Sequence, residues 1–227
     1  MNAVPLRRHD LVWLDPAIDA GGFAVAAEQA EHARSWVQQG RPLVVARQSG
    51  PATKQEDQLN LGFTLPSAPV RTRVSLRGHR AAIIRHTRPL LLPDAIKHAP
   101  HSWRDGMSNL HELCTKAGAV ARVYGSLSSQ AYAGEIYVDA ASDLDLLLEC
   151  SAHTRLDELL AVLEKFPVQT LRIDGEILAP SGWAVAWREL ASAMRSATPC
   201  KVLAKSDREA RLIPLEQFFT SPPALPA

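Results

Sequence analysis

The sequence predicts an α/β (α+β) protein built of two parts. In the second half, short apolar segments with strand character alternate with amphipathic helical segments, which is typical of a domain built around a small mixed sheet. Prolines at positions 89, 93 and 100 mark a junction between the two halves. We therefore expect a smaller N-terminal α/β domain over residues 1–93, a C-terminal domain over residues 94–219 and a loose tail over residues 220–227.

The N-terminal part is expected to combine one helix with several strands. An alanine-rich segment over residues 24–39 predicts the helix, and Gly40 stands where a C-cap glycine would end it. Apolar or alternating segments predict the strands, which lie over residues 10–14, 42–48 and 70–78.

The C-terminal part is expected to alternate helices and strands. Strands are predicted over residues 119–124, 142–149, 170–178 and 200–205, and helices over residues 109–117, 156–166 and 181–195. Asn109 is the candidate N-cap of the first helix, because Glu112 follows three residues later. On the last helix an apolar stripe with helical spacing indicates core packing and comprises Trp183, Trp187, Leu190 and Met194.

Composition and charge narrow the class of protein. The 227 residues carry a formal net charge of +1, which gives no reason to expect a general nucleic-acid or membrane binder. The three cysteines are far apart, so neither a disulfide framework nor a zinc site is expected. The N-terminal stretch lacks the apolar core of a signal peptide, and no apolar run is long enough to span a membrane. We therefore expect a cytoplasmic protein.

Two aspartates lie in an otherwise apolar strand-like run, SDLDLLLEC. Asp143 and Asp145 alternate with Leu144, Leu146 and Leu148, so the carboxylates share one face while the leucines face the core. Two neighbouring carboxylates repel each other unless a cation or a proton lies between them. Mg²⁺ prefers carboxylate, water and phosphate oxygens as ligands, so we expect it as the cofactor at this pair.

Two neighbouring segments can complete such a site. Gly125 and Ser126 end the preceding strand, where backbone N–H groups and a hydroxyl can hold a phosphate; an ordinary turn is the alternative. On the strand RIDGEI, Arg172, Asp174 and Glu176 alternate onto one face, and Arg172 is a candidate phosphate contact. Three carboxylates can clamp two metal ions; we prefer Asp174 as the third and keep Glu176 as the alternative. Asp-Gly at 174–175 also fits a hairpin turn.

An apolar strand ending in Gly-Ser, then Asp-x-Asp, then a third acid on a later strand resembles the nucleotidyltransferase superfamily. The segments that narrow this resemblance are RRHDLVWLD, RPLVVAR, VYGSLSSQAYAG, SDLDLLLEC, DGEILAPSGWAVAWREL and KVLAKS. Together they resemble the phosphoribosyl-dephospho-CoA transferases of malonate decarboxylase, also called malonate decarboxylase holo-acyl-carrier-protein synthases. The stretch of 16 residues between Ser126 and Asp143 is longer than the usual loop of the superfamily.

The resemblance implies a fold and a reaction. The C-terminal domain would be nucleotidyltransferase-like. The group donor would be 2'-(5''-triphosphoribosyl)-3'-dephospho-CoA, and the acceptor would be a serine of the acyl carrier protein subunit of malonate decarboxylase. Diphosphate would be released, and Asp143 and Asp145 would be the essential metal-binding acids. Mg²⁺ there would neutralise the charge that develops during in-line attack by the serine hydroxyl.

A stretch of the N-terminal part is strongly basic. Residues 58–93 contain no Asp or Glu but hold Arg71, Arg73, Arg77, Arg80, Arg85 and Arg88. Alternation places Arg71, Arg73 and Arg77 on one strand face, where they could bind the phosphates of the donor or an acidic carrier protein. The alternative is a solvated face whose arginine stems cover apolar surface.

Two rival functions remain open from the sequence. The first is a different nucleotidyltransferase, which would use ATP or another nucleoside triphosphate on a small molecule, a nucleic acid or another protein. The second is a non-catalytic module of the same fold that binds the donor or the carrier. Offering the purified protein an apo carrier with each donor separates the two enzyme readings, and replacing Asp143 and Asp145 by asparagine tests the non-catalytic one.

Overall fold

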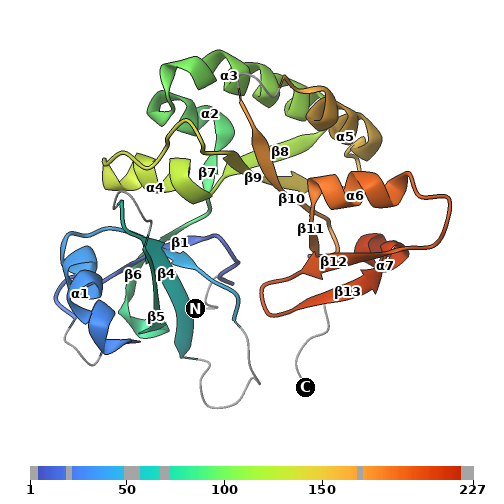
Figure 1. Ribbon diagram of the computed structural model, residues 1–227. Coiled ribbons are helices and arrows are strands. Elements are labelled where there is room, and N and C mark those ends of the chain that lie inside the picture. The colour runs from blue at the N-terminus through green and yellow to red at the C-terminus, as the bar shows by residue number, and fades with distance from the viewer. Residues whose placement is uncertain (1–4, 19–21, 49–56, 67–71, 168–170, 221–227) are drawn as a thin grey trace. The chain divides into compact units, whose positions relative to one another are not determined.

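The structure is a computed structural model that describes residues 5–18, 22–48, 57–66, 72–167 and 171–220. The chain divides into two units after Pro89, the first of the prolines that mark the expected junction (Figure 1). Each unit has helices and a sheet of its own, which confirms the α+β class. Of the expected tail, residues 221–227 lie outside the described residues. No helix in the described ranges has the length and apolar character needed to cross a membrane.

The first unit is built on an antiparallel sheet with the strand order β2-β5-β4-β3-β1-β6. Its strands are β1 (Leu11–Leu14), β2 (Phe23–Val25), β3 (Leu43–Val45), β4 (Gln58–Thr64), β5 (Arg73–His79) and β6 (Ile83–Thr87). Its helices are the α-helix α1 (Ala30–Gln38) and the short 3-10 turns η1 (Ala27–Gln29) and η2 (Arg80–Ala82).

The predicted helix over residues 24–39 is wrong at its start. The first residues of that segment, Ala24 and Val25, belong to β2 and pair with β5. The 3-10 turn η1 follows, so α1 begins only at Ala30. The predicted end is confirmed, because Gly40 follows the helix with a φ of 64°. The helix packs on the sheet through Trp36, whose ring stacks on Phe63 of β4 with centroids 4.3 Å apart.

Strand β5 has the alternation that the sequence predicts. Val74 and Leu76 are buried, whereas Arg73, Ser75 and Arg77 are exposed on the other face. The third arginine of this expected set, Arg71, lies outside the described residues.

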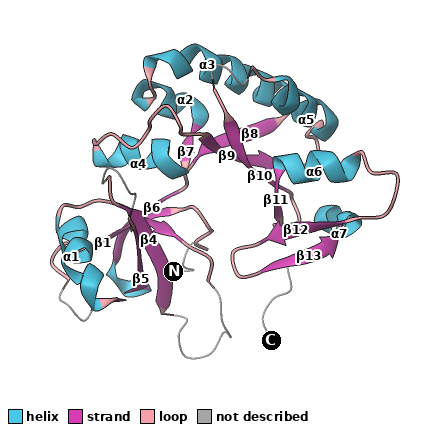
Figure 2. Ribbon diagram, viewed as in Figure 1, coloured by secondary structure: helices cyan, strands magenta, loops and turns pink. Residues whose placement is uncertain are grey.

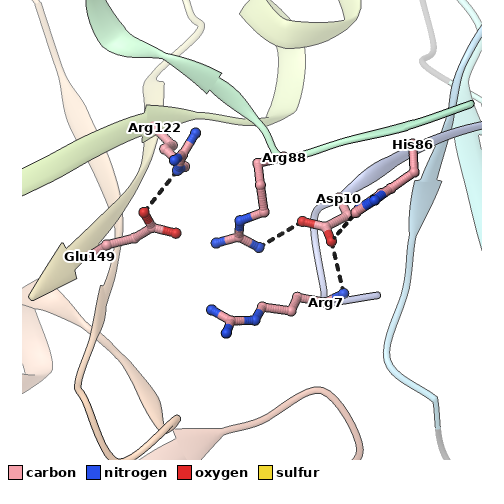
Figure 3. A network of polar contacts seen from close by, with 6 residues as sticks. All are labelled: Arg7, Asp10, His86, Arg88, Arg122 and Glu149. Carbon is pink, nitrogen blue, oxygen red and sulfur yellow. Dashed lines mark hydrogen bonds and ion pairs between the residues drawn. The ribbon is translucent and has the colours of Figure 1, made fainter. Parts of the chain in front are cut away.

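A buried carboxylate ties the two ends of the first unit together (Figure 3). Asp10 is fully buried beside β1, and its Oδ2 accepts hydrogen bonds from the backbone N–H of Arg7 at 2.9 Å and from Nε2 of His86 at 2.8 Å. Its Oδ1 accepts a hydrogen bond from Nη1 of Arg88 at 2.6 Å. The buried charge is therefore compensated by a cation and two further donors, which gives Asp10 a structural role.

The second unit is built on a mixed sheet with the order β13-β12-β11-β10-β9-β8-β7. Its strands are β7 (Leu90–Leu91), β8 (Ala119–Val123), β9 (Leu144–Cys150), β10 (Ile173–Leu178), β11 (Ala184–Ala186), β12 (Lys201–Lys205) and β13 (Ala210–Pro214). Its helices are α2 (Leu92–Ala95), η3 (Ile96–His98), α3 (His101–Lys116), α4 (Gly125–Ala133), α5 (Leu156–Lys165), α6 (Trp187–Met194) and α7 (Leu215–Thr220). Strands β9 and β10 run parallel, and the other described neighbours run antiparallel.

The core of the second unit contains Leu144, Leu146 and Leu148 of β9 together with residues of α3 and α5. These two helices lie side by side (Figure 2). Helix α3 contributes Trp103, Met107, Leu110 and Cys114, all buried, at spacings of four, three and four residues. It begins at His101, so the predicted start is wrong and Asn109 lies inside the helix rather than at its N-cap.

The predicted helix over residues 181–195 is also wrong in its first part. Gly182 has a φ of 91°, and residues 184–186 form β11, which pairs with β10 and β12. The helix α6 therefore begins at Trp187. The core role of the apolar stripe is confirmed, because Trp183, Trp187 and Leu190 are buried and Met194 packs against the same core.

Candidate active site

Gly125 and Asp145 lie against each other in the second unit. The N–H of Tyr124 donates a hydrogen bond to the backbone oxygen of Asp145 at 3.1 Å, which ties the end of β8 to β9. Gly125 has a φ of 67°, and a Cβ on it would lie 1.9 Å from Oδ2 of Asp145. The carboxylate therefore occupies the space that only glycine leaves free. Ser126 is half-buried in the first turn of α4.

The long stretch between Ser126 and Asp143 is ordered by side-chain contacts. Its first part is helix α4, which ends at Gly134 with a φ of 70°. Gln130 then holds the returning chain: its Oε1 accepts the N–H groups of Tyr137 and Val138, each at 3.0 Å. Its Nε2 donates to the backbone oxygen of His98 at 2.6 Å. The stretch that the sequence leaves unexplained thus supports the position of Asp143.

The turn just before Asp143 is fixed as well. Ser142 is buried, its hydroxyl donates to Oδ1 of Asp139 at 3.0 Å, and the same hydroxyl oxygen accepts the N–H of Asp139. Asp143 follows directly and Leu144 begins β9, so Asp143 and Asp145 flank the first residue of the strand.

The register between the parallel strands β9 and β10 brings a third acid, Asp174, beside Asp145. Asp174 of β10 is paired directly with Asp145 of β9, so both side chains project from the same face of the sheet. Gly175 follows with a φ of 135°, and a Cβ there would lie 1.9 Å from the backbone oxygen of Leu146. The Asp-Gly pair thus lies inside a strand where β9 approaches closely, and the hairpin-turn reading is wrong.

Asp143 and Asp174 each form an ion pair with an arginine. Nε of Arg172 lies 2.7 Å from Oδ1 of Asp143, and Arg172 also donates to the backbone oxygen of Ala141. Nη1 of Arg188, in the first turn of α6, lies 3.3 Å from Oδ1 of Asp174. All four side chains are between 44% and 56% exposed, so solvent screens both pairs. Arg188 is the site residue that the sequence reasoning missed.

Glu176, the alternative third acid, is engaged elsewhere. Its side chain is 6% exposed, and its Oε1 lies 2.8 Å from Nζ of Lys205 on β12. In the register of the parallel pair it stands opposite Leu147 rather than opposite Asp145. The structure therefore brings Asp174 beside Asp145, and it places Glu176 in a partly buried ion pair with Lys205.

Asp143, Asp145 and Asp174 carry the oxygen ligands that a hard cation prefers, but their side chains do not converge on a single binding position. Among the described residues no group of three or more His, Cys, Asp or Glu side chains is placed to hold a metal ion. Asp143, Asp145 and Asp174 nevertheless lie at the N-terminal ends of the neighbouring strands β9 and β10, which we call the carboxylate edge. The two arginine pairs there are exposed, and exposed ion pairs are weak.

Expected phosphate contacts fall in both units. Gly125, Ser126 and Arg172 lie at the carboxylate edge of the second unit, and the first N–H groups of α4 add the positive end of a helix dipole. Arg73 and Arg77 belong to β5 of the first unit.

Two cysteines of the second unit are unsuited to be nucleophiles. Burial, with a smaller contribution from the neighbouring Cys150, raises the pKa of the Cys114 thiol to about 12. Burial likewise raises the pKa of Cys150 to about 11. Both thiols are therefore protonated near neutral pH, whereas the thiolate is the reactive form.

Comparison with known proteins shows which family models and relatives the chain matches. The family model described as the phosphoribosyl-dephospho-CoA transferase MdcG N-terminal domain matches residues 7–89, and that of the C-terminal domain matches residues 90–216. A protein of Xanthomonas campestris pv. campestris (strain 8004), named phosphoribosyl-dephospho-CoA transferase, is 37% identical over 213 residues, which are 93% of this chain and 96% of the relative.

Two more distant relatives carry the same name. The protein of Bradyrhizobium diazoefficiens is 30% identical, over 95% of this chain and 93% of its own length. That of Azotobacter vinelandii is 28% identical, over 90% of this chain and 91% of its own length. No solved structure matches the chain. Two family models that together span residues 7–216, and relatives matched over nearly their full length, show that the chain belongs to the phosphoribosyl-dephospho-CoA transferase family.

Proposed function

We propose that the protein transfers the phosphoribosyl-dephospho-CoA group from 2'-(5''-triphosphoribosyl)-3'-dephospho-CoA to a serine of the acyl carrier protein of malonate decarboxylase. Membership of the transferase family supports the group that is transferred. The observation that carries the mechanism is the edge where Asp145, Asp174 and Gly125 meet. We place the reaction in the cytoplasm.

The cofactor in this proposal is Mg²⁺, held by Asp143, Asp145 and Asp174. When bound, it would neutralise the negative charge that develops on the phosphate oxygens during transfer. The acids fit this task because carboxylate oxygens are preferred ligands of Mg²⁺. The arginine pairs of Asp143 and Asp174 would have to open first, and exposed pairs of this kind cost only about 0–1 kcal/mol to break.

The other residues bind and orient the donor. Backbone N–H groups at Gly125 and Ser126 can donate to the phosphate that is attacked, and Arg172, once turned from Asp143, can pair with a phosphate oxygen. The serine oxygen of the carrier forms a bond to the α-phosphorus, and the bond from that phosphorus to the diphosphate breaks. Diphosphate leaves with the bonding electrons, and the serine proton passes to a carboxylate of the set, for which Asp174 is our choice.

The arginines of β5 provide a second part of the proposal. Arg73 and Arg77 are exposed, and their partners on β4, Thr64 and Asn60, carry no charge that would neutralise them. We assign this face, together with Arg71, to the phosphates of the donor or to an acidic carrier protein.

Mass spectrometry of the apo carrier tests the proposal. Wild-type protein with Mg²⁺ and the triphosphoribosyl donor should add the mass of one phosphoribosyl-dephospho-CoA group to the carrier. The double variant Asp143→Asn, Asp145→Asn should add none while its unfolding curve stays close to that of the wild type. Asp157→Asn, which removes an exposed acid of α5 in the same unit, is the matched control and should transfer normally.

Three results would contradict the proposal. Transfer by the double variant at the wild-type rate would remove the role of the two acids. Labelling of the carrier only with an ordinary nucleoside triphosphate would favour a different nucleotidyltransferase. Tight binding of donor and carrier without any transfer would favour a non-catalytic module.

A further inference from the structure

A pocket of about 430 Å³ opens between α5 and α6 of the second unit. Its apolar wall includes Phe166, Leu171, Ile173 and Trp187. Two arginines, Arg188 and Arg195, lie at positions seven residues apart along the same helix segment, which corresponds to about 10 Å. Glu164 of α5 also lines the pocket and forms an ion pair with Arg195. The pocket is therefore a slot with an apolar wall, bordered by Arg188 and by this ion pair.

The pocket adjoins the carboxylate edge of the same unit. Ile173, which lines it, precedes Asp174 on β10, but the two side chains project from opposite faces of the strand, so Ile173 itself does not reach the acids. Arg188 connects the two places: its guanidinium lies 4.4 Å from the ring centroid of Trp187 and 3.3 Å from Oδ1 of Asp174. A ligand in the slot would thus contact the residue that holds the third acid.

The walls favour a flat aromatic ring that carries phosphates. Aromatic side chains and guanidinium planes stack on nucleobases, and guanidinium groups pair with phosphate oxygens. The indole N–H of Trp187, one of the lining residues, is buried and has no acceptor among the described residues. The volume lies toward the lower end for small-molecule pockets, which suits a nucleoside rather than the whole donor.

We propose that this pocket binds the adenine nucleotide part of the dephospho-CoA donor, with Arg188 as a ligand of its phosphates. The assignment rests on the proposed function for the identity of the donor. Arg188 leaves Asp174 when the carboxylates take up a cation, and its guanidinium then pairs with phosphate oxygens. The flexible pantetheine arm, which needs partners for its amides, extends outside the slot.

Calorimetry with fragments that cannot react tests the pocket without the transfer step. Dephospho-CoA should bind the full chain, and 4'-phosphopantetheine, which lacks the adenylyl group, should bind at least about 10-fold more weakly. Equal binding of the two fragments would show that adenine is not recognised and would overturn the assignment.

Arg188→Gln should weaken dephospho-CoA about 10-fold or more, because a charge-assisted contact to phosphate is lost. The same variant should bind Mg²⁺ at least as tightly as the wild type, because Asp174 no longer has a competing cation. Arg155→Gln is the matched control, because Arg155 is also paired with an acid, Glu158, and its side chain is 52% exposed, close to the 55% of Arg188. This control should leave the affinities for dephospho-CoA and for Mg²⁺ unchanged.

The outcomes separate this inference from the proposed function. If Arg188→Gln loses affinity for dephospho-CoA and for Mg²⁺ together, Arg188 has a structural role and the assignment is wrong. Wild-type affinity of this variant for dephospho-CoA also overturns it, even when the carrier is modified normally. If the fragments bind as expected but no carrier is modified, the proposed transfer fails and the pocket assignment stands.

Discussion

The contact between Gly125 and Asp145 can be tested by adding a single methyl group. In Gly125→Ala the new Cβ would lie 1.9 Å from Oδ2 of Asp145, 2.7 Å from its Cγ and 3.1 Å from its Cβ. Because real Cβ contacts stay beyond about 3.0 Å, the carboxylate must retreat by about 1 Å. A displacement of this size in a reacting constellation costs about 100-fold in rate, which is the loss of transfer that we expect.

The effect on stability should be much smaller than the effect on transfer. An alanine at a φ of 67° costs about 1–2 kcal/mol of the free energy of unfolding. Gly134→Ala is the matched control, because Gly134 has a φ of 70° on the same helix and no atom lies within 4 Å of its added Cβ. It should lose a similar stability and keep its transfer activity.

The assay combines urea unfolding with mass spectrometry of the apo carrier. We expect similar shifts of the unfolding midpoint for the two variants and a rate difference of about 100-fold between them. Equal transfer rates for Gly125→Ala and Gly134→Ala would refute the claim that Gly125 makes room for the carboxylate of Asp145.

Two further predictions concern the buried groups of each unit. Asp10→Asn removes the buried negative charge beside β1 and should lower the free energy of unfolding by roughly 3 kcal/mol, measured by urea denaturation; a loss below about 1 kcal/mol would show that the ion pairs of Asp10 matter little. Cys114 and Cys150, with pKa values of about 12 and about 11, should resist iodoacetamide near pH 8 in the folded protein and react after unfolding. Rapid labelling of either thiol in the folded state, followed by mass spectrometry, would contradict the burial that raises their pKa values.

Local sequence patterns predict the features of this fold that depend only on residues close together in the sequence. Alternation along β9 turns Asp145 away from the core that Leu144, Leu146 and Leu148 enter, and strand geometry alone requires this. Asp143 lies one residue before the strand. The exposed arginines of β5 follow from the same rule. The two-part α+β organisation is also predictable, because strand and helix periods change along the chain.

Features that depend on long-range pairing are not predictable in this way. The register that sets Asp174 opposite Asp145 depends on how β10 docks on β9, about thirty residues away. The approach of Arg188 to Asp174 depends on the packing of α6 against β10, which the local apolar spacing does not show. The predicted start of that helix is wrong because pairing with two strands turns residues 184–186 into β11. The small residues of GSLSSQAYA give α4 no apolar stripe, so its helix is visible only in the structure.

The mass of the apo acyl carrier protein after incubation with the wild-type chain, Mg²⁺ and 2'-(5''-triphosphoribosyl)-3'-dephospho-CoA tests the central claim most directly. We expect the addition of one phosphoribosyl-dephospho-CoA group to one serine, with release of one diphosphate. We also expect no addition when that serine is replaced by alanine. An unchanged carrier mass with an intact donor and a folded protein, or addition to the alanine variant, would contradict the central claim.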